Sequence, residues 1–210
     1  MSWSSPTLNR PGIVLCEGQD EVRLLQVLSR DLGIDSLQFI DCGGCVQFHS
    51  RIKLVMVAPG RQQVRAIGIV RDAEDDANGA KASVQDRLRE QRLPVPDKPL
   101  TRAAMEGKPD TVFLIVPPDR PAGMMEDLIL ECLAEHPAKS CHETFFDCLR
   151  HAQVDLSGEP QKRRLQALLA AMPSDGLAKG IGEAAEKGIL PMAHPVLSDL
   201  RHFLGLVAGN

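Results

Sequence analysis

The sequence predicts an α/β protein in which a mostly parallel sheet of at least four strands is flanked by helices and followed by a helical C-terminal tail. Short apolar, often β-branched runs alternate with segments whose apolar residues recur at helical spacing, which is typical of parallel strands joined by helices. Two of the runs end abruptly in carboxylates, at the place where an open α/β sheet presents its binding site. After residue 120 only the helical spacing continues.

The predicted strands are short, and each ends at a turn. They cover residues 12–16, 37–41, 64–72 and 111–116. Gly33 and the pair Pro59-Gly60 mark helix ends. The predicted helices run from about 20 to 32, from after residue 45 to about 58, from 80 to 92, from about 123 to 133, and over 141–152, 161–172 and 195–207.

The composition indicates a folded, globular chain. Of the 210 residues, 43% are hydrophobic and 25% are charged, which excludes a disordered chain. The formal net charge of −4 gives no overall attraction to nucleic acid or to an anionic membrane. No apolar run approaches the roughly 20 residues needed to cross a bilayer, and residues 1–12 lack the apolar core of a signal peptide. We therefore expect a cytoplasmic protein with no membrane partner and with six reduced cysteines.

The length suits one domain of ordinary size. We expect a single domain over residues 1–210, with an α/β core at about 12–136 and a helical C-terminal extension at about 137–210. The extension has apolar helical stripes and no strand pattern, so we expect it to pack on the sheet rather than to form a second domain.

A cluster of carboxylates closes the third predicted strand: Asp72, Glu74, Asp75 and Asp76. Their mutual repulsion costs free energy unless a cation lies among them, so the cluster predicts a divalent metal. The alternative is that Asp75 or Asp76 caps the following helix while the others face water. For Asp72, which lies at the strand end itself, we favour a functional role.

The first predicted strand also ends in carboxylates, Glu17 and Asp20. If the first and third strands are neighbours, these side chains converge with Asp72 on one crevice. Mg²⁺ binds one or two protein carboxylates together with waters and substrate phosphates. Glu17 would then be a general acid or base beside the metal, or a ligand of a second metal.

Glu126 and Asp127 begin the helix that follows the fourth strand. Negative charge at a helix N-terminus is stabilising in itself, which is the structural explanation of this pair. The functional explanation is that Glu126, together with Asp119, supplies a ligand to a second metal from a neighbouring strand end.

Two other motifs also have a structural and a functional explanation. Cys42-Gly43-Gly44-Cys45 has the form of a redox or zinc pair, but we favour buried or surface thiols, and the two glycines leave room for a phosphate. A zinc site would take its other ligands from Cys141, His142, Cys148 and His151. Lys162-Arg163-Arg164 opens a helix and is expected on a solvated face, because three adjacent helical residues point in different directions.

Three motifs, in order, carry a family resemblance. Glu17-Gly18-Gln19-Asp20 follows the first strand, the run from Asp72 to Asp76 follows the third, and Pro118-Asp119 is followed by Gly123-Met124-Met125-Glu126-Asp127. Over roughly residues 12–205 the chain resembles a small stand-alone Toprim-like family known as a domain of unknown function. That family is related to the Toprim domain shared by topoisomerases, bacterial primases, small RNA-maturation nucleases and OLD-family nucleases.

The resemblance implies a Toprim-like α/β fold and phosphoryl transfer on DNA or RNA that depends on Mg²⁺ or Mn²⁺. It puts Glu17 at the acid/base position and Asp72 with Glu74 at the metal-binding pair. Glu74 stands where the family pattern has a second Asp, and its longer side chain leaves the coordination geometry open. Glu17 and Asp72 are thus the predicted catalytic residues, and the predicted metal ligands are Asp20, Asp72, Glu74, Asp76 and Glu126.

Two classes of function stay open. The first is a metal-dependent nuclease or a related phosphotransferase. The second is a non-catalytic Toprim-like module that binds nucleic acid or a partner protein, and it stays open because the basic content is low and no accessory DNA-binding domain is evident. A phospho-acceptor receiver domain is discounted, because Glu17-Gly18-Gln19-Asp20 is a poor match to its paired acids and no fifth strand followed by a lysine is evident.

The same residues also lead to expectations about binding partners. Binding to DNA or RNA is expected to weaken as salt rises and to use arginines near the crevice, of which Arg71 is the nearest in sequence. The chain has no G-x-x-x-x-G-K-S/T motif and so no P-loop of its own, which means that an ATPase would be a separate partner.

Overall fold

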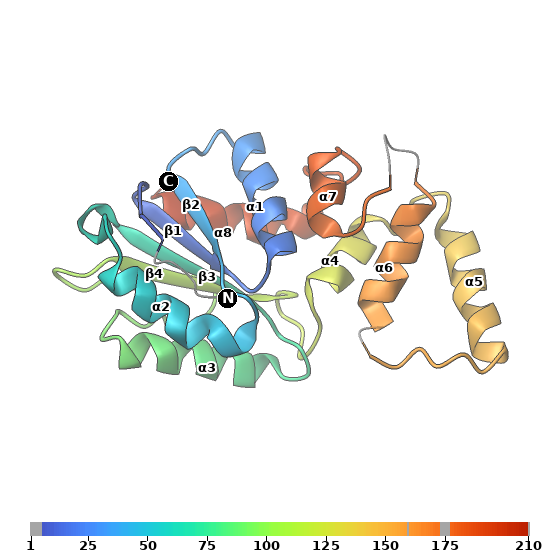
Figure 1. Cartoon of the computed structure of the whole chain (residues 1–210), viewed down its shortest axis with the longest axis horizontal. Helices are drawn as coiled ribbons and strands as arrows, with labels where there is room; N and C mark the ends of the chain where they lie inside the picture. Colours follow the sequence, from blue (N-terminus) through green and yellow to red (C-terminus); the bar gives the residue numbers. More distant parts are fainter. Residues whose placement is uncertain (1–5, 159, 173–176, 210) are drawn as a thin grey trace.

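The structure is a computed structural model that describes residues 6–158, 160–172 and 177–209, without the side chains of Cys45 and His49. A four-stranded, all-parallel sheet with strand order β2-β1-β3-β4 forms the left-hand part in Figure 1 together with the helices that flank it. The strands are β1 (Gly12–Cys16), β2 (Leu37–Asp41), β3 (Ala66–Asp72) and β4 (Asp110–Val116). The predicted α/β architecture and its four strands are confirmed.

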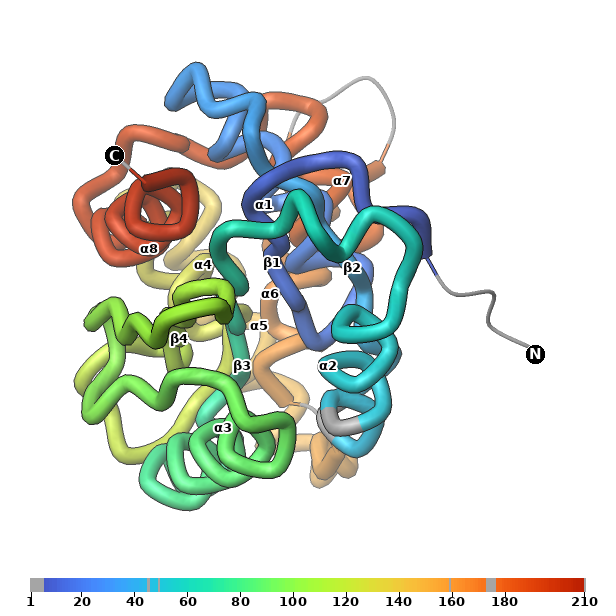
Figure 2. The backbone as a smooth tube through the Cα atoms, turned by 90° about the vertical axis from the view of Figure 1, so that its left-hand side faces the viewer, coloured from blue at the N-terminus to red at the C-terminus, as the bar shows by residue number. Residues whose placement is uncertain are grey.

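Helices cover both faces of the sheet (Figure 2). α2 (Phe48–Val57) and α3 (Ala77–Glu90) lie on one face, and α1 (Gln19–Asp31) and α8 (Ser198–Ala208) lie on the other. Side chains alternate along each strand, so Leu15, Ile69 and Phe113 lie in register on the α2–α3 face. Because neither face meets water, the strands are nearly continuous apolar runs.

Gly68 in β3 allows a close approach between the sheet and α8. A Cβ atom at this position would lie 2.5 Å from Cγ2 of Val207 and 2.6 Å from Cζ of Phe203. Both of these side chains are buried. The absence of a side chain at Gly68 is therefore needed for α8 to pack where it does.

The remaining helices form the C-terminal part of the chain. They are α4 (Met125–Cys132), α5 (Lys139–His151), α6 (Pro160–Ala170) and α7 (Ile181–Glu186), and Figure 1 shows α4, α6 and α5 extending beyond one end of the sheet. One apolar cluster joins Val116 of the sheet to Leu128 in α4, Leu168 in α6 and Leu204 in α8. The tail thus shares part of the core of the sheet.

The helices predicted in this region are present, and one more is added. The six-residue helix α7 was not predicted, because it is too short to display a helical period. Single turns of 3₁₀ helix occur at Cys45–Gln47, Arg61–Gln63 and Pro195–Leu197. Within the described ranges, no helix has both the length and the apolar character needed to cross a membrane.

The carboxyl ends of β1 and β3 lie side by side. The two strands pair in parallel, β1 ends one residue before Glu17, and β3 ends at Asp72. Glu17 and Asp72 therefore share one edge of the sheet, as expected from the sequence.

Candidate active site

An open, acidic cleft of about 400 Å³ lies at this edge of the sheet. It is bounded by the segments after β1, β2 and β3 and by the beginnings of α4 and α6. Its lining residues are Glu17, Gly18, Glu21, Asp41, Gly43, Gly44, Asp72, Glu74, Met124, Glu126 and Lys162. Six of them carry a carboxyl group and one carries an amine, so the cleft is strongly acidic.

Asp72 connects three elements of the fold. Its Oδ1 accepts a hydrogen bond from the backbone N–H of Met125 at 3.0 Å, at the N-terminus of α4. Its own backbone N–H donates to Oε2 of Glu17 at 3.4 Å, a long contact. The two predicted catalytic residues are therefore in contact, and the Asp72 carboxylate is held against the start of a helix.

The electrostatic setting of Asp72 disfavours its charged form. Burial raises its pKa to about 9, together with the nearby charges of Glu21, Glu17 and Glu126, while the hydrogen bond from Met125 lowers it. The ordinary pKa of Asp is about 3.9. At neutral pH and without a cation, this carboxyl group therefore holds a proton.

Glu21 belongs to the cleft, and the sequence did not single it out as a site residue. Its Oε2 accepts a hydrogen bond from the backbone N–H of Gly18 at 2.8 Å, which is part of a capping box at the start of α1. Burial raises its pKa to about 7, and the charges of Glu126 and Glu17 also raise it. Its signal was its place three residues after Gly18, at the N3 position in the first turn of α1.

Two predicted metal ligands do not line the cleft. Asp20 points toward α7, where its Oδ1 accepts a hydrogen bond from the backbone N–H of Gly182 at 3.1 Å. Asp76 is the N-cap of α3 and accepts from the backbone N–H of Asn78 at 3.0 Å. For Asp76 the structure therefore agrees with the capping alternative.

Glu74 and Glu126 are predicted ligands that do line the cleft. Glu74 is exposed and has a positive φ of 50°, and its backbone exchanges two hydrogen bonds with Gly123, at 2.8 and 2.7 Å. Burial raises the pKa of Glu126, whereas the charge of Lys162 lowers it. Its neighbour Asp127 accepts from the backbone N–H of Met124 at 2.9 Å, so the structural explanation holds for Asp127, while Glu126 both lies in the first turn of α4 and lines the cleft.

Lys162, in the first turn of α6, carries the only amine among the described residues that line the cleft. The expectation of a solvated face for Lys162-Arg163-Arg164 holds only in part, because the three side chains diverge. Arg164 pairs with Glu143 and lies 4.8 Å from the centre of the Phe146 ring, so it holds α6 against α5. The sequence offered no signal for the position of Lys162, which depends on the packing of α6 on α4.

Arg71 does not line the cleft, contrary to the expectation from its proximity in sequence. Adjacent residues in a strand point to opposite faces, so Arg71 and Asp72 diverge. Arg71 instead lines a hollow on the α2–α3 face with Val84 and Arg87. The rim of the cleft is thus basic only at Lys162 among the described lining residues.

The glycines after β2 lie in the cleft, but their backbone donors are occupied. The N–H of Gly43 donates to Oδ1 of Asp41 at 2.7 Å, and the N–H of Gly44 donates to the carbonyl of Glu17 at 2.8 Å. A Cβ at Gly44 would meet nothing within 4 Å, so space is present. The segment leaves room for a phosphate without offering these two N–H groups to it.

The cysteines give no support to a zinc site. Cys42 is buried, and burial raises the pKa of its thiol to about 12. The side chain of Cys45 lies outside the described residues. His142 is buried, with Nε2 at 2.8 Å from the carbonyl of Arg164.

The carboxylate oxygens that line the cleft suit a hard divalent ion, but these carboxylates are spread around an open cleft. Carboxylate oxygens are the ligands that Mg²⁺ and Mn²⁺ prefer. Burial and neighbouring carboxylates raise the pKa values of Asp72 and Glu21. Across the described residues, no three His, Cys, Asp or Glu side chains are grouped so as to hold a metal ion. Binding of an ion would thus require the carboxylates to converge further.

The fold and its acidic edge define a Toprim-like α/β protein. The C-terminal region of the Xanthomonas campestris pv. campestris OLD protein has a similar structure, with a TM-score of 0.51 and 14% identity over 95% of this chain and 97% of that one. The C-terminal region of the Burkholderia pseudomallei OLD protein gives a TM-score of 0.51 and 11% identity over 96% of this chain and all of that one (100%). At these identities the likeness shows the fold.

The chain belongs to the family described as "Protein of unknown function (DUF3226)", whose model matches residues 11–208. No curated protein matches the sequence. The resemblance to a stand-alone Toprim-like family related to OLD proteins is thereby confirmed.

Proposed function

We propose that this protein is a phosphoryl-transfer enzyme that depends on a divalent metal, and that it acts as a nuclease on DNA or RNA in the cytoplasm. One observation carries the proposal: six carboxyl groups line one cleft at the carboxyl ends of the strands, where burial and neighbouring carboxylates raise the pKa values of Asp72 and Glu21 to about 9 and about 7. A cation in the cleft would offset both causes. Strongly perturbed carboxylates in a cleft are typical of functional sites.

The proposed metal ligands are Asp72, Glu74 and Glu126, with Glu21 beside them. The bound ion would polarise a phosphate oxygen and lower the pKa of a bound water. Asp20 and Asp76 are left out of this set, because each is engaged with a helix N-terminus outside the cleft.

Glu17 and Lys162 have separate proposed roles. Glu17 lies beside Asp72 and would take a proton from the attacking water or return one to the leaving oxygen. The ammonium group of Lys162 would offset the negative charge of the substrate phosphate. The resemblance to Toprim domains supports these roles at Glu17, Asp72 and Glu74, and the likeness to OLD proteins supports them through the fold alone.

The test is a cleavage assay on labelled single- and double-stranded DNA and RNA, with Mg²⁺ or Mn²⁺ added to metal-free protein. Wild type should cleave at least one substrate, Asp72→Asn should not, and Glu17→Gln should cleave about 10²-fold to 10⁴-fold more slowly. Asp75→Asn is the matched control, since Asp75 is exposed and does not line the cleft. Cleavage that persists unchanged in Asp72→Asn, or that is absent from wild type with both metals, contradicts the proposal.

One observation favours a second candidate function. Since no metal-binding group is formed among the described residues, a non-catalytic Toprim-like module that binds nucleic acid is the alternative. This alternative also includes binding to a partner protein or to a separate ATPase. It is supported if nucleic acid binds to wild type and to Asp72→Asn equally, without cleavage and regardless of metal.

A further inference from the structure

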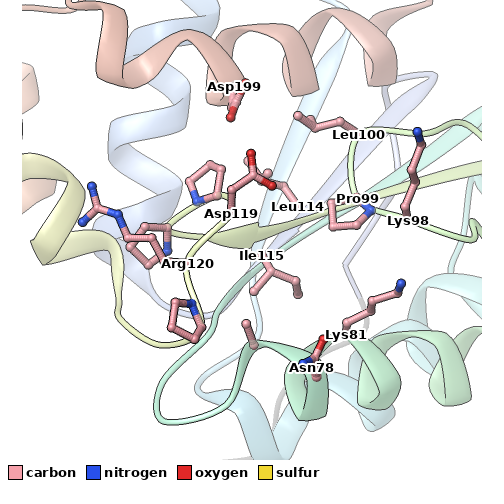
Figure 3. Close-up of a pocket in the computed structure, with 14 residues that line it drawn as sticks. Asn78, Lys81, Lys98, Pro99, Leu100, Leu114, Ile115, Asp119, Arg120 and Asp199 are labelled. Carbon is pink, nitrogen blue, oxygen red and sulfur yellow. The ribbon is translucent and has the colours of Figure 1, made fainter.

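A second hollow, of about 410 Å³, lies at the carboxyl end of β4 (Figure 3). We call it the β4 pocket. It lies between the beginnings of α3 and α8, and the segments 98–100 and 117–121 form its sides. Its volume is within the range of about 300–1,000 Å³ that is typical of small-molecule sites.

The floor of the β4 pocket is apolar. Leu114, Ile115 and Pro117 are buried, and Pro99 and Leu100 lie partly exposed beside them. A floor of aliphatic side chains and proline rings favours a ligand with an uncharged, ring-like body.

Charged side chains stand on two opposite sides of this floor. In Figure 3 the ammonium groups of Lys81 and Lys98 lie on one side, and the carboxylates of Asp119 and Asp199 lie on the side of α8. Arg120 points away and pairs with Glu131.

The four charges are not committed to the fold. Arg102, by contrast, pairs with Asp110 at 2.7 Å. In the part of the chain that the structure describes, neither the two lysines nor the two aspartates make an ion pair or a side-chain hydrogen bond. They are available to a ligand that is anionic at one end and carries hydrogen-bond donors at the other.

The β4 pocket and the acidic cleft share one wall, the loop 117–124. Residues 117–121 line the pocket, whereas Met124 lines the cleft. The loop is held to β3 and α3 by the Glu74–Gly123 backbone pair and by a hydrogen bond from the N–H of Ala77 to the carbonyl of Pro121 at 2.8 Å. Asp72 and Val116 end neighbouring strands in register, so the two hollows are adjacent.

We propose that the β4 pocket binds one nucleotide. Its phosphate would meet Lys81 and Lys98, its sugar and base would lie on the apolar floor, and amino groups of the base would donate to Asp119 and Asp199. The adjacency to the cleft points to a nucleotide that flanks the reacting phosphate in a nucleic-acid strand. This last assignment rests on the proposed function, whereas the pocket itself would bind a free nucleotide by the same contacts.

The acidic side of the pocket implies a preference among bases. Adenine, cytosine and guanine carry an exocyclic amino group that donates hydrogen bonds, and uracil carries none. Carboxylates only accept hydrogen bonds when ionised. AMP, CMP and GMP are therefore expected to bind more tightly than UMP, and the double variant Asp119→Asn/Asp199→Asn should weaken this preference.

Binding of AMP, CMP, GMP and UMP to the full chain, measured by calorimetry in the presence of EDTA, tests the pocket. The double variant Lys81→Gln/Lys98→Gln should bind AMP at least about tenfold more weakly than wild type, as expected for lost charged contacts. The control Lys53→Gln/Lys108→Gln removes the same charge from two exposed lysines outside the pocket and should bind as wild type does. No binding by wild type, or equal binding by both double variants, overturns the proposal.

Competition with a single-stranded hexanucleotide separates the two sources of the nucleotide. Displacement of AMP by the hexamer, lost in Lys81→Gln/Lys98→Gln, supports a substrate subsite. Binding of AMP without displacement supports a separate nucleotide site. Since EDTA removes the metal and Asp72 does not line the pocket, AMP should bind equally to Asp72→Asn. The pocket would thus stand if no cleavage were found, and the proposed nuclease would stand if cleavage occurred while AMP failed to bind.

Discussion

Oδ1 of Asp72 accepts a hydrogen bond from the backbone N–H of Met125 at 3.0 Å, so the last residue of β3 is also bound to the start of α4. A helix N-terminus favours negative charge. Burial and the charges of Glu21, Glu17 and Glu126 outweigh that effect, because the pKa of Asp72 is about 9. The protonation state of Asp72 is thus the property that a bound cation would change.

Asp72→Asn is expected to separate a metal site from a purely structural contact. Asn keeps an oxygen that can accept from Met125 and is uncharged, like the protonated carboxyl group of metal-free Asp72, so at neutral pH the metal-free variant should be about as stable as wild type. An ion that binds only the folded state stabilises wild type by about 2.7 kcal/mol at a hundredfold excess over Kd. Thermal melts with and without Mg²⁺ or Mn²⁺ should therefore show a shift in wild type and little in the variant. A loss of about 1 kcal/mol in the variant at every metal level would instead assign Asp72 to helix capping alone.

The metal-free protein is expected to lose stability as pH rises. The folded-state pKa values of Asp72 and Glu21 are about 9 and about 7, above their ordinary values of about 3.9 and 4.3. Between the two values the folded state binds more protons than the unfolded state, so the free energy of unfolding falls as pH rises. For Asp72 this window runs from about pH 4 to about pH 9, and Asp72→Asn should flatten the profile. Urea unfolding across that range measures it, and a metal-free stability that increases from neutral to alkaline pH would contradict these assignments.

Asp76→Ala is expected to destabilise the protein by about 1 kcal/mol whether or not metal is present, because it removes the N-cap of α3. Asp75→Ala is the control, since Asp75 is exposed and substitutions of this kind stay within about 0.5 kcal/mol. Chemical unfolding with and without Mg²⁺ measures both. A metal shift that disappears in Asp76→Ala would return Asp76 to the set of ligands.

Gly68→Ala is expected to destabilise the protein by about 1–3 kcal/mol through overpacking. The added methyl group would meet Val207 and Phe203 of α8 at 2.5 and 2.6 Å. Gly205→Ala, within α8, is the matched control, because a Cβ there meets nothing within 4 Å. A helical Gly replaced by Ala gains up to about 1 kcal/mol. The urea midpoint should fall for Gly68→Ala and rise for Gly205→Ala. If both variants had the same effect, the contact between the sheet and α8 would not be the cause of the destabilisation.

The fold was predictable because it depends on local patterns. The apolar runs at 12–16 and 111–116 are buried strands, and helical spacing located α1, α3 and α8. The shared edge of Glu17 and Asp72 was predictable too, since parallel strands end at the same edge.

The composition of the cleft was predictable only in part. The choice between Asp20 and Glu21 depends on where α1 begins, and a start at Gln19 turns Glu21 rather than Asp20 into the cleft. Arg71 was misplaced by reasoning from proximity, although the alternation of strand side chains was a signal against it. Lys162 is brought to the cleft by the packing of α6 on α4, and no local sequence pattern predicts that packing.

Lys162→Gln is expected to weaken nucleic-acid binding, because Lys162 carries the only amine among the described residues that line the cleft. A lysine that contacts phosphate contributes to affinity at every sequence, and its loss lowers the salt slope of log K by about 1. Arg163→Gln is the matched control, because it also removes one positive charge from α6. Arg163 is exposed and does not line the cleft. Fluorescence anisotropy with labelled single strands, at salt concentrations from about 50 to 200 mM, measures both variants. Equal losses in the two variants would mean that only the overall charge matters, and binding that ignores salt would favour a protein partner over a nucleic acid.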